Sequence, residues 1–274
     1  MAEPKSDKEL AFLQDLYIAT DWGERFADLV DKHVKLPREG RVLYLEAGTG
    51  SHALAMQERG GAKLTIIGTD HNEECVELAR AKALALHERA EFKREDSRAQ
   101  SFGDEQFDLV LVNNSFIGLA KVAGILSEAV RVAKAGATVA WWLPTASSFG
   151  EFFSLYWEAL FNLDTAEHGT AVEHLIADLP TVSDAEKWSD EAGLEAVTSW
   201  TSIEEFDYAS GSEFLNSPLI ADFLLPNWLE SIPEAMRQKV RDELGRIIDE
   251  ERHTGEFALT LKATLVAGKK GRAQ

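Results

Sequence analysis

The fold of this chain is decided by Val42-Leu-Tyr-Leu-Glu-Ala-Gly-Thr-Gly-Ser-His52, an apolar run that leads into a turn with two glycines. The apolar run predicts a buried strand, and the pattern after the turn predicts a helix. Gly48 and Gly50 permit positive φ angles and let a ligand approach the backbone closely. The unpaired N–H groups at the start of the helix favour a carboxylate or a phosphate. Because glycine turns of this kind also occur without a ligand, the function of this turn has to be inferred together with the neighbouring segments.

Apolar runs and helical patterns alternate on the C-terminal side of this turn. Further strands are predicted at Leu64–Ile67, Ala90–Phe92, Phe107–Val112 and Ala137–Leu143, and helices at Ala53–Arg59, Glu73–His87 and Leu119–Ala135. Continuous apolar runs are typical of strands that are covered on both faces. The alternation predicts a parallel sheet with right-handed crossovers, which is a doubly wound α/β fold.

The segments on either side of this core are mainly helical by pattern. The first forty residues predict helices, and Asp21 with Glu24 predicts a capping box that opens the second of them. Helices are further predicted at Ser148–Phe161, at Ser183–Ala192, from Ser212 and from Pro233, and strands at Leu194–Phe206 and Phe257–Ala267. Most of the chain beyond the core is therefore expected to add helices and two closing strands.

No composition shift marks a second domain. We therefore expect one domain over residues 1–274, with N-terminal helices or a lid at 1–40 and the cofactor-binding core at 41–145. The remainder, 146–274, is expected to hold cap helices and closing strands, with Ala146–Ala177 and Gly211–Arg252 as the cap insertions.

The charge of the chain excludes several classes of partner. Its 47 acidic and 28 basic side chains give a net charge of −19, which repels nucleic-acid phosphates and anionic membranes. A C-terminal basic run of Lys269, Lys270 and Arg272 is interpreted as a solvated tail. No segment approaches the ~20 apolar residues that span a bilayer, and Met1–Leu13 lacks the apolar core of a signal peptide. We expect a cytoplasmic protein that binds neither nucleic acid nor a membrane.

Acidic residues follow two of the predicted strands. Asp70 ends the second strand, twenty residues past Gly50, where a carboxylate is placed to accept hydrogen bonds from both ribose hydroxyls of a nucleotide. The alternative is that Asp70 only caps the helix that starts near Glu73. Asp96 ends the third strand, where it is placed to accept from an adenine amino group, unless it lies in a solvated loop.

Taken in chain order, these segments resemble the successive motifs of class I S-adenosylmethionine-dependent methyltransferases, in the small-molecule branch. The resemblance is carried by Tyr44–Gly50, Asp70, Asp96-Ser97, Phe107–Val112 and Val130–Gly136. It implies a Rossmann-like, mostly parallel seven-stranded sheet whose last strand inserts antiparallel beside the fifth. It also implies S-adenosyl-L-methionine as the cofactor and methyl transfer to a small-molecule acceptor by in-line displacement.

The resemblance implies a set of cofactor-binding residues at the strand ends: Glu46, Ala47, Gly48, Gly50, Asp70, His71, Asp96, Ser97 and Asn113. The glycines would approach the methionine portion of the cofactor. Asp70 would hold the ribose, with His71 next to it. Asp96 and Ser97 would contact the adenine. Asn113 would lie beneath the sulfonium.

Three positions depart from the family's usual pattern. Tyr44 stands where an acidic residue is usual, Glu46 where a glycine is usual, and Ser51 or His52 where a further glycine is common. The Glu46 carboxylate either reaches the ammonium group of the cofactor or crowds the turn. The affinity for the cofactor depends on which of the two applies.

The sequence fixes no catalytic residue, because methyl transfer needs a general base only when the acceptor arrives protonated. His168 and His174 are candidate bases, with Tyr17 and Tyr156 as hydroxyl alternatives. The six-residue spacing of the two histidines does not predict a metal site. The single cysteine, Cys75, excludes an internal disulfide and a cysteine-based metal cluster, and its helical context predicts that it is buried.

Aromatic side chains recur at helical spacing within Ser148–Phe161. Core packing is the simpler interpretation of this cluster, and a ring-lined pocket for an apolar acceptor is the alternative. Tyr17 and Trp22 are candidates for an N-terminal lid over the cofactor.

Two other functions fit parts of the sequence. Gly48-Thr-Gly-Ser-His-Ala53 matches the dinucleotide turn of a nicotinamide-dependent oxidoreductase, but none of the four tyrosines precedes a lysine by four residues. A non-catalytic relative that keeps the fold would account for Tyr44 and Glu46. Asn113–Phe116 lacks the Asn/Asp-Pro-Pro-aromatic motif of nucleic-acid amino methyltransferases. The sequence identifies neither the acceptor, the attacked atom nor the oligomeric state.

Overall fold

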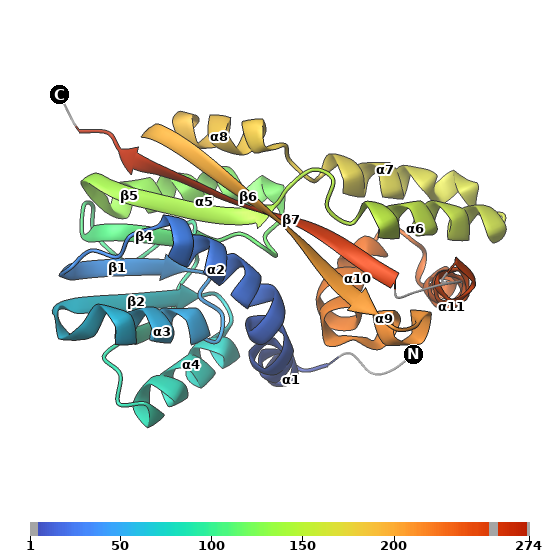
Figure 1. Cartoon of the computed structure of the whole chain (residues 1–274), viewed down its shortest axis with the longest axis horizontal. Helices are drawn as coiled ribbons and strands as arrows, with labels where there is room; N and C mark the ends of the chain where they lie inside the picture. The colour runs from blue at the N-terminus through green and yellow to red at the C-terminus, as the bar shows by residue number, and fades with distance from the viewer. Residues whose placement is uncertain (1–4, 252–256, 273–274) are drawn as a thin grey trace. The chain divides into compact units, whose positions relative to one another are not determined.

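A seven-stranded sheet forms the centre of the computed structural model, which describes residues 5–251 and 257–272 (Figure 1). Its strands are β1 (Gly40–Leu45), β2 (Leu64–Asp70), β3 (Glu91–Arg94), β4 (Phe107–Asn113), β5 (Ala133–Pro144), β6 (Leu194–Tyr208) and β7 (Phe257–Lys270). The strand order is β3-β2-β1-β4-β5-β7-β6, and the first five strands are parallel. β7 lies beside β5 and runs opposite to it. The predicted doubly wound sheet with an antiparallel last strand is confirmed.

Helices connect the strands of the sheet and extend the chain on both sides of it. The N-terminal ones are α1 (Asp7–Leu13), the π-helix η1 (Gln14–Trp22) and α2 (Gly23–His33). Between the strands of the core lie α3 (Ser51–Gly60), η2 (Gly61–Lys63), α4 (Glu73–Ala85) and α5 (Leu119–Val132). After β5 follow α6 (Gly150–Asn162), η3 (Ala166–His168), α7 (Gly169–Ala177), α8 (Val182–Glu191), α9 (Gly211–Asn216), η4 (Leu219–Leu224), α10 (Leu225–Trp228) and α11 (Glu234–Glu251).

The chain divides into two compact units. The larger one contains residues 5–143, 182–201 and 263–272, and the smaller one contains 144–181, 202–251 and 257–262. Both predicted cap insertions fall in the smaller unit, except that Arg252 lies outside the described residues. The assignment of the whole chain to one domain stays a prediction.

The core of the larger unit accounts for the apolar runs of the sequence. Leu43 and Leu45 of β1 are fully buried, and they pack in one cluster with Val110 and Val112 of β4 and with the buried face of α5. Burial of each such side chain contributes roughly 1.5–3 kcal/mol relative to exposure. The sheet therefore holds the carboxyl ends of β1, β2 and β4, where the predicted site lies, in a fixed register.

The aromatic helix α6 belongs to the core of the smaller unit. Phe152 is fully buried and stacks on Trp228, with ring centroids 4.1 Å apart. Phe149, Phe153 and Tyr156 are also buried. Of the two interpretations of this cluster, the contacts support core packing.

Two local expectations were wrong. Asp21 caps no helix, because α1, η1 and α2 follow one another without a break, and its carboxylate instead pairs with Arg25 at 3.0 Å. The capping box lies at Ser6 and Glu9. The basic C-terminal run is no solvated tail either, since β7 continues to Lys270, whose Nζ donates to the carbonyl oxygen of Ala133 at 2.9 Å.

Across residues 5–251 and 257–272, no helix combines the length and the apolar character that a bilayer crossing requires.

Candidate functional site

The turn after β1 has a backbone that requires glycine at two positions and strains a third. Gly48 and Gly50 have φ angles of 57° and 77°. A Cβ at Gly50 would lie 2.6 Å from the ring of Phe92, so no side chain fits there. Glu46 shares the left-handed region, with φ of 54°, which costs a non-glycine residue about 1–3 kcal/mol. The chain therefore keeps a carboxylate at a strained position of the turn.

Asp70, at the end of β2, fastens this turn to the neighbouring strand. Its Oδ2 accepts the Gly48 N–H at 2.8 Å and its Oδ1 accepts the Asn72 N–H at 2.9 Å. The cap of α4 is Asn72, whose side chain accepts from the N–H groups of Glu74 and Cys75, so Asp70 is not the cap. Burial, and then the negative charge of Glu46, raise the pKa of Asp70 to about 6.

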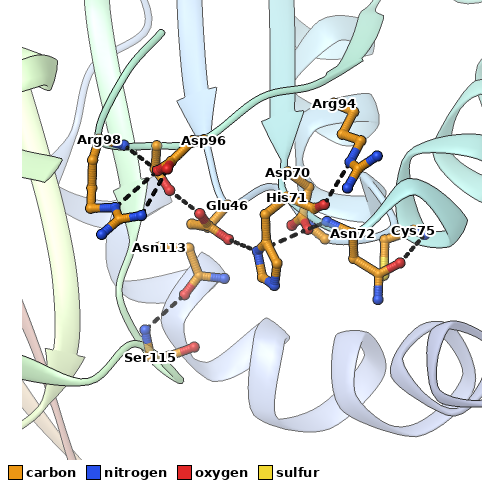
Figure 2. A network of polar contacts seen from close by, with 12 residues as sticks. Glu46, Asp70, His71, Asn72, Cys75, Arg94, Asp96, Arg98, Asn113 and Ser115 are labelled. Carbon is orange, nitrogen blue, oxygen red and sulfur yellow. Dashed lines mark hydrogen bonds and ion pairs between the residues drawn. The ribbon is translucent and has the colours of Figure 1, made fainter. Parts of the chain in front are cut away.

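Glu46 joins the residues predicted at three different strand ends, as Figure 2 shows. Its carboxylate accepts hydrogen bonds from the Ser97 hydroxyl and from His71 Nδ1, the latter at 2.8 Å. His71 Nδ1 also lies 3.6 Å from Asp70. The hydrogen bond to Glu46 raises the pKa of His71. The ligand atoms of Glu46, Asp70 and His71 lie within 4.8 Å of one another, but such acidic groups are common without a metal, and no metal is assigned to them.

One cavity opens beside this network, and we call it the Glu46 cavity. It has a volume of about 460 Å³ and is lined by Glu46, His71, Arg94, Glu95, Asp96, Ser97, Arg98, Ile117, Lys121 and Ile125. Asp96 is half exposed and pairs with Arg98 at 2.8 Å, and the hydrogen bonds from Arg98 lower its pKa to about 2. The lining thus offers a buried carboxylate, a hydroxyl and charged groups of both signs.

A second cavity lies on the other side of the turn, and we call it the Tyr44 cavity. It has a volume of about 440 Å³. Its aromatic walls are Trp22, Phe26, Tyr44, Phe116 and Trp142, and Ala47, Gly48 and Thr49 of the turn and Asn113 of β4 also line it. Charged side chains in the lining include Glu24, Asp28, Asp31 and Arg59. Trp22 stacks on Phe116 at 5.0 Å, and Tyr44 meets Trp142 edge-on at 5.5 Å. Glu46 therefore faces one cavity, while the next three residues face the other.

A chain of hydrogen bonds runs from the wall of the Tyr44 cavity. The Tyr44 hydroxyl lies 3.2 Å from His52 Nδ1, and His52 Nε2 lies 3.0 Å from Asp31 Oδ1. Arg59 contacts both oxygens of Asp31, at 2.5 and 2.6 Å. The sequence marks Tyr44 and His52 only as departures from the family pattern and gives no signal for Asp31. Their joint departure was the available signal, since a tyrosine and a histidine eight residues apart replace an acid and a glycine.

The N-terminal helices lie over the turn. The Asp15 carboxylate accepts from the Thr49 hydroxyl at 2.7 Å and from Lys82 at 2.5 Å. Gln14 accepts a hydrogen bond from Cys75, whose predicted burial is confirmed. Both contacts start from η1, and π-helical segments are frequent at functional sites.

The candidate bases named from the sequence lie away from these cavities or in the smaller unit. Tyr17 is half exposed and lines neither cavity, although the other lid candidate, Trp22, lines the Tyr44 cavity. His168, His174 and Tyr156 lie on η3, α7 and α6. Their roles stay predictions. Of the nine predicted cofactor residues, all except Gly50 and Asp70 line one of the two cavities.

A glycine turn between two cavities, at the carboxyl ends of a parallel sheet that closes with an antiparallel strand, defines the fold of a class I methyltransferase. Residues 42–136 match the family described as "Methyltransferase domain". Together with the sheet order, this match makes residues 42–136 similar to the class I S-adenosylmethionine-dependent methyltransferases.

Two curated relatives are similar to about half of the chain. The demethylmenaquinone methyltransferase of Deinococcus radiodurans is 30% identical over 146 residues, which are 52% of this chain and 59% of that protein. The demethylmenaquinone methyltransferase of Lactobacillus johnsonii is 26% identical over 144 residues, 52% of this chain and 57% of its own length. The chain thus spans less than two thirds of the length of either relative.

Solved structures share the fold at lower identity. The YcgJ protein of Bacillus subtilis gives a TM-score of 0.60 at 19% identity, covering 91% of this chain and 100% of its own. The phosphoethanolamine N-methyltransferase 2 of Haemonchus contortus, solved with S-adenosylhomocysteine, gives 0.54 at 14% identity, covering 98% of this chain and 61% of that one.

Proposed function

We propose that this chain transfers a methyl group from S-adenosylmethionine to a small-molecule acceptor by in-line displacement. The observation that carries the proposal is the strained glycine turn that separates a polar cavity from an aromatic one at the strand ends. A cofactor that joins a nucleoside to an amino acid through a cationic sulfur needs two such environments. The side chains that line each cavity fit one part of this cofactor.

The Glu46 cavity fits the nucleoside. Ribose hydroxyls are donors that a carboxylate binds well, and Glu46 presents one from the wall of the cavity. Asp70 is held behind it by the backbone N–H groups of the turn, so we assign it to shaping the turn and Glu46 to the ribose, with His71 beside it. Ser97 and Asp96 line the same cavity and are assigned to the adenine. Because Glu46 points to this side, we do not assign it to the ammonium group.

The Tyr44 cavity fits the methionine portion and the acceptor. Ala47, Gly48 and Asn113 line it, and Gly50 shapes the turn behind them. When bound, the cofactor supplies an electrophilic methyl group on a cationic sulfur. Aromatic faces such as those of Trp22 and Phe116 favour a cation at close range, and they exclude water from the reacting atoms. The walls also orient the acceptor, which lowers the barrier of a displacement reaction.

The class of acceptor is part of the proposal. The curated relatives are named as methyltransferases of demethylmenaquinone, a quinone. An aromatic-lined cavity of about 440 Å³ suits a planar, apolar acceptor of that kind. The net charge of −19 supports a small molecule rather than a nucleic acid, and a cytoplasmic location stays a prediction.

Thermal unfolding with S-adenosylmethionine, S-adenosylhomocysteine and NAD tests the cofactor assignment. A ligand at about 100 times its Kd adds roughly 2.7 kcal/mol, which raises the Tm of a chain of this size by several degrees. We expect both sulfur ligands to stabilise the wild type and NAD to have no effect. The Glu46→Gln variant should lose most of the shift, whereas the Glu58→Gln variant, changed at an exposed residue of α3, should keep it. No shift with either sulfur ligand would contradict the proposal and favour a non-catalytic relative.

A further inference from the structure

The hydrogen bonds that link Tyr44, His52 and Asp31 in the wall of the Tyr44 cavity are all donated in the same direction, toward Asp31. Arg59 engages both oxygens of Asp31, so this carboxylate is ionised and only accepts hydrogen bonds. Burial opposes its ionisation, but the hydrogen bonds from His52 and Arg59 outweigh burial and lower the pKa of Asp31. His52 therefore donates its Nε2 proton to Asp31. Its Nδ1 is then left as the acceptor for the Tyr44 hydroxyl.

The ring of Tyr44 is held in the wall of the cavity, where its hydroxyl is placed to exchange a proton with a bound ligand. Tyr44 is 5% exposed and yet lines the cavity, with its ring edge-on to Trp142 at 5.5 Å and to His52 at 5.7 Å. His52 and Asp31 also line the cavity, but both nitrogens of His52 are engaged, so a proton from a ligand passes to the imidazole by way of the Tyr44 hydroxyl. Tyr44 is thus the first residue of a three-residue proton path along the wall of the cavity, which ends at Asp31 on α2.

A methyl acceptor with a hydroxyl group needs a path for its proton when it binds in this cavity. Besides Asp31, the carboxylates of Glu24 and Asp28 line the cavity, and the only cation in its lining among the described residues, Arg59, is paired with Asp31. Negative charge around a hydroxyl disfavours its ionisation. A phenol or quinol therefore enters in its neutral form, and its oxygen becomes a good nucleophile only when the proton is taken away.

We propose that Tyr44, His52 and Asp31 form a proton relay that deprotonates a hydroxylated aromatic acceptor in the Tyr44 cavity, an inference that rests on the methyl transfer proposed above. The acceptor O–H passes its proton to the Tyr44 oxygen while the Tyr44 proton moves to His52 Nδ1, and the imidazolium formed is paired with Asp31. The electron pair released on the acceptor forms the new bond to the methyl carbon, and the pair of the broken C–S bond goes to sulfur. His52 later returns its proton to water.

The pKa of Tyr44 agrees with a relay rather than a stored phenolate. Burial, and then the charge of Asp31, raise the pKa of Tyr44 well above its ordinary value. Tyr44 thus stays neutral. It takes a proton from the acceptor while it gives its own proton to His52. It is the catalytic residue of the relay, while His52 and Asp31 act through it.

The competing interpretation is structural. Asp31 on α2 bonds His52 and Arg59 on α3, so the same contacts tie two helices together. A structural tie predicts that the loss of the Tyr44 hydroxyl changes nothing in the cavity beyond one hydrogen bond. A relay predicts that this hydroxyl controls the protonation of whatever phenol is bound.

The test uses 4-nitrophenol, whose phenolate absorbs visible light, as a probe with S-adenosylhomocysteine present. In the wild type we expect the bound probe to ionise at a pH lower by about one unit than in free solution, because its proton passes to His52. Tyr44→Phe and His52→Gln should abolish this shift, and Asp31→Asn should reduce it. Tyr208→Phe, which removes the hydroxyl of a buried tyrosine in the smaller unit, should leave it unchanged.

An unshifted or raised ionisation pH in the wild type, or no binding of the probe at millimolar concentration, would overturn the relay. An equal shift in wild type and Tyr44→Phe would do the same. The Tm shift given by S-adenosylhomocysteine is measured on the same samples and separates the two proposals. If that shift persists in all variants while the probe shift is absent, the relay fails and the methyltransferase assignment stands. If the wild type shows no Tm shift, the assignment itself fails.

Discussion

The Glu46 cavity and the Tyr44 cavity share one turn but differ in chemistry. The first is lined by a buried carboxylate, a hydroxyl and exposed ion pairs, and the second by five aromatic rings, among them that of the hydrogen-bonded Tyr44, and by the carboxylates of Glu24, Asp28 and Asp31. Under the proposed function, the first environment would bind the polar nucleoside by hydrogen bonds, whereas the aromatic walls of the second would hold a planar acceptor. Glu46 and Tyr44, two of the three departures from the family pattern, thus line different cavities on either side of one turn.

The largest effect is expected from a side chain placed in the turn that separates the cavities. Gly50→Val puts a Cβ 2.6 Å from Phe92 at a φ of 77°, so overpacking and backbone strain combine to about 3 kcal/mol or more. Gly61→Val is the matched control, because Gly61 has a φ of 67° but open space around it. Denaturant unfolding should show a clearly smaller loss for the control. Equal losses would mean that contact with Phe92 does not shape the turn.

A second prediction concerns the acid behind the Glu46 cavity. The pKa of Asp70 is about 6 in the folded chain against an ordinary value of 3.8, so its ionisation costs stability. That cost is absent below about pH 4 and is complete above about pH 6, and it reaches roughly 3 kcal/mol. Asp70→Asn does not ionise. Its free energy of unfolding should therefore rise relative to the wild type as the pH increases from about 4 to 7.

Denaturant unfolding of both proteins across this pH range measures the difference directly. The uncharged side chain still loses one acceptor for the N–H groups of Gly48 and Asn72, so the variant need not be more stable at any single pH. Only the change of this stability difference with pH tests the raised pKa of Asp70. A difference that stays constant with pH would show that Asp70 ionises normally.

The core of the fold was predictable because its signals are local. Buried strands are continuous apolar runs, and the glycines of the turn have no alternative at positive φ, as Gly50 shows. The grouping of Glu46, His71 and Ser97 was also predictable in outline, since parallel strands end at the same edge. The proposed assignment of the ribose to Glu46 in place of Asp70 was not predictable. It depends on which of the two carboxylates accepts hydrogen bonds from the backbone N–H groups around the turn.

The Tyr44 cavity was much less predictable. Its walls come from η1, α2, β1, β5 and the segment after β4, and no motif links Trp22 to Phe116 or Asp31 to His52. Asp21 failed as a cap for a related reason. Its pattern suggested a helix start, but the chain continues without a break from η1 into α2, and Asp21 pairs with Arg25 one turn further on.

A third prediction separates the two ends of the ligand. Glu46→Gln keeps the size of the side chain but removes a charge that accepts hydrogen bonds, which is worth roughly 1.5–3 kcal/mol, or about 10- to 150-fold in affinity. Calorimetry should show weaker binding of both adenosine and S-adenosylhomocysteine. The Glu58→Gln variant should bind both as the wild type does. Unchanged binding of adenosine by Glu46→Gln would remove Glu46 from the nucleoside site.

The smallest effect is expected in the wall of the aromatic cavity. Phe116→Leu removes a ring that stacks on Trp22 at 5.0 Å, a contact worth about 1 kcal/mol. Thermal unfolding should show a loss of stability of that order, while calorimetry should show unchanged binding of adenosine. Weaker binding of adenosine would show that the two cavities are not separate in function.

The most direct test of this division is a crystal structure with S-adenosylhomocysteine bound. We expect the adenosine in the Glu46 cavity, with the ribose hydroxyls on the Glu46 carboxylate, and the sulfur on the side of Gly48 and Asn113. Density for the nucleoside among the rings of the Tyr44 cavity, or ribose hydroxyls bound by Asp70 with Glu46 turned away, would contradict it.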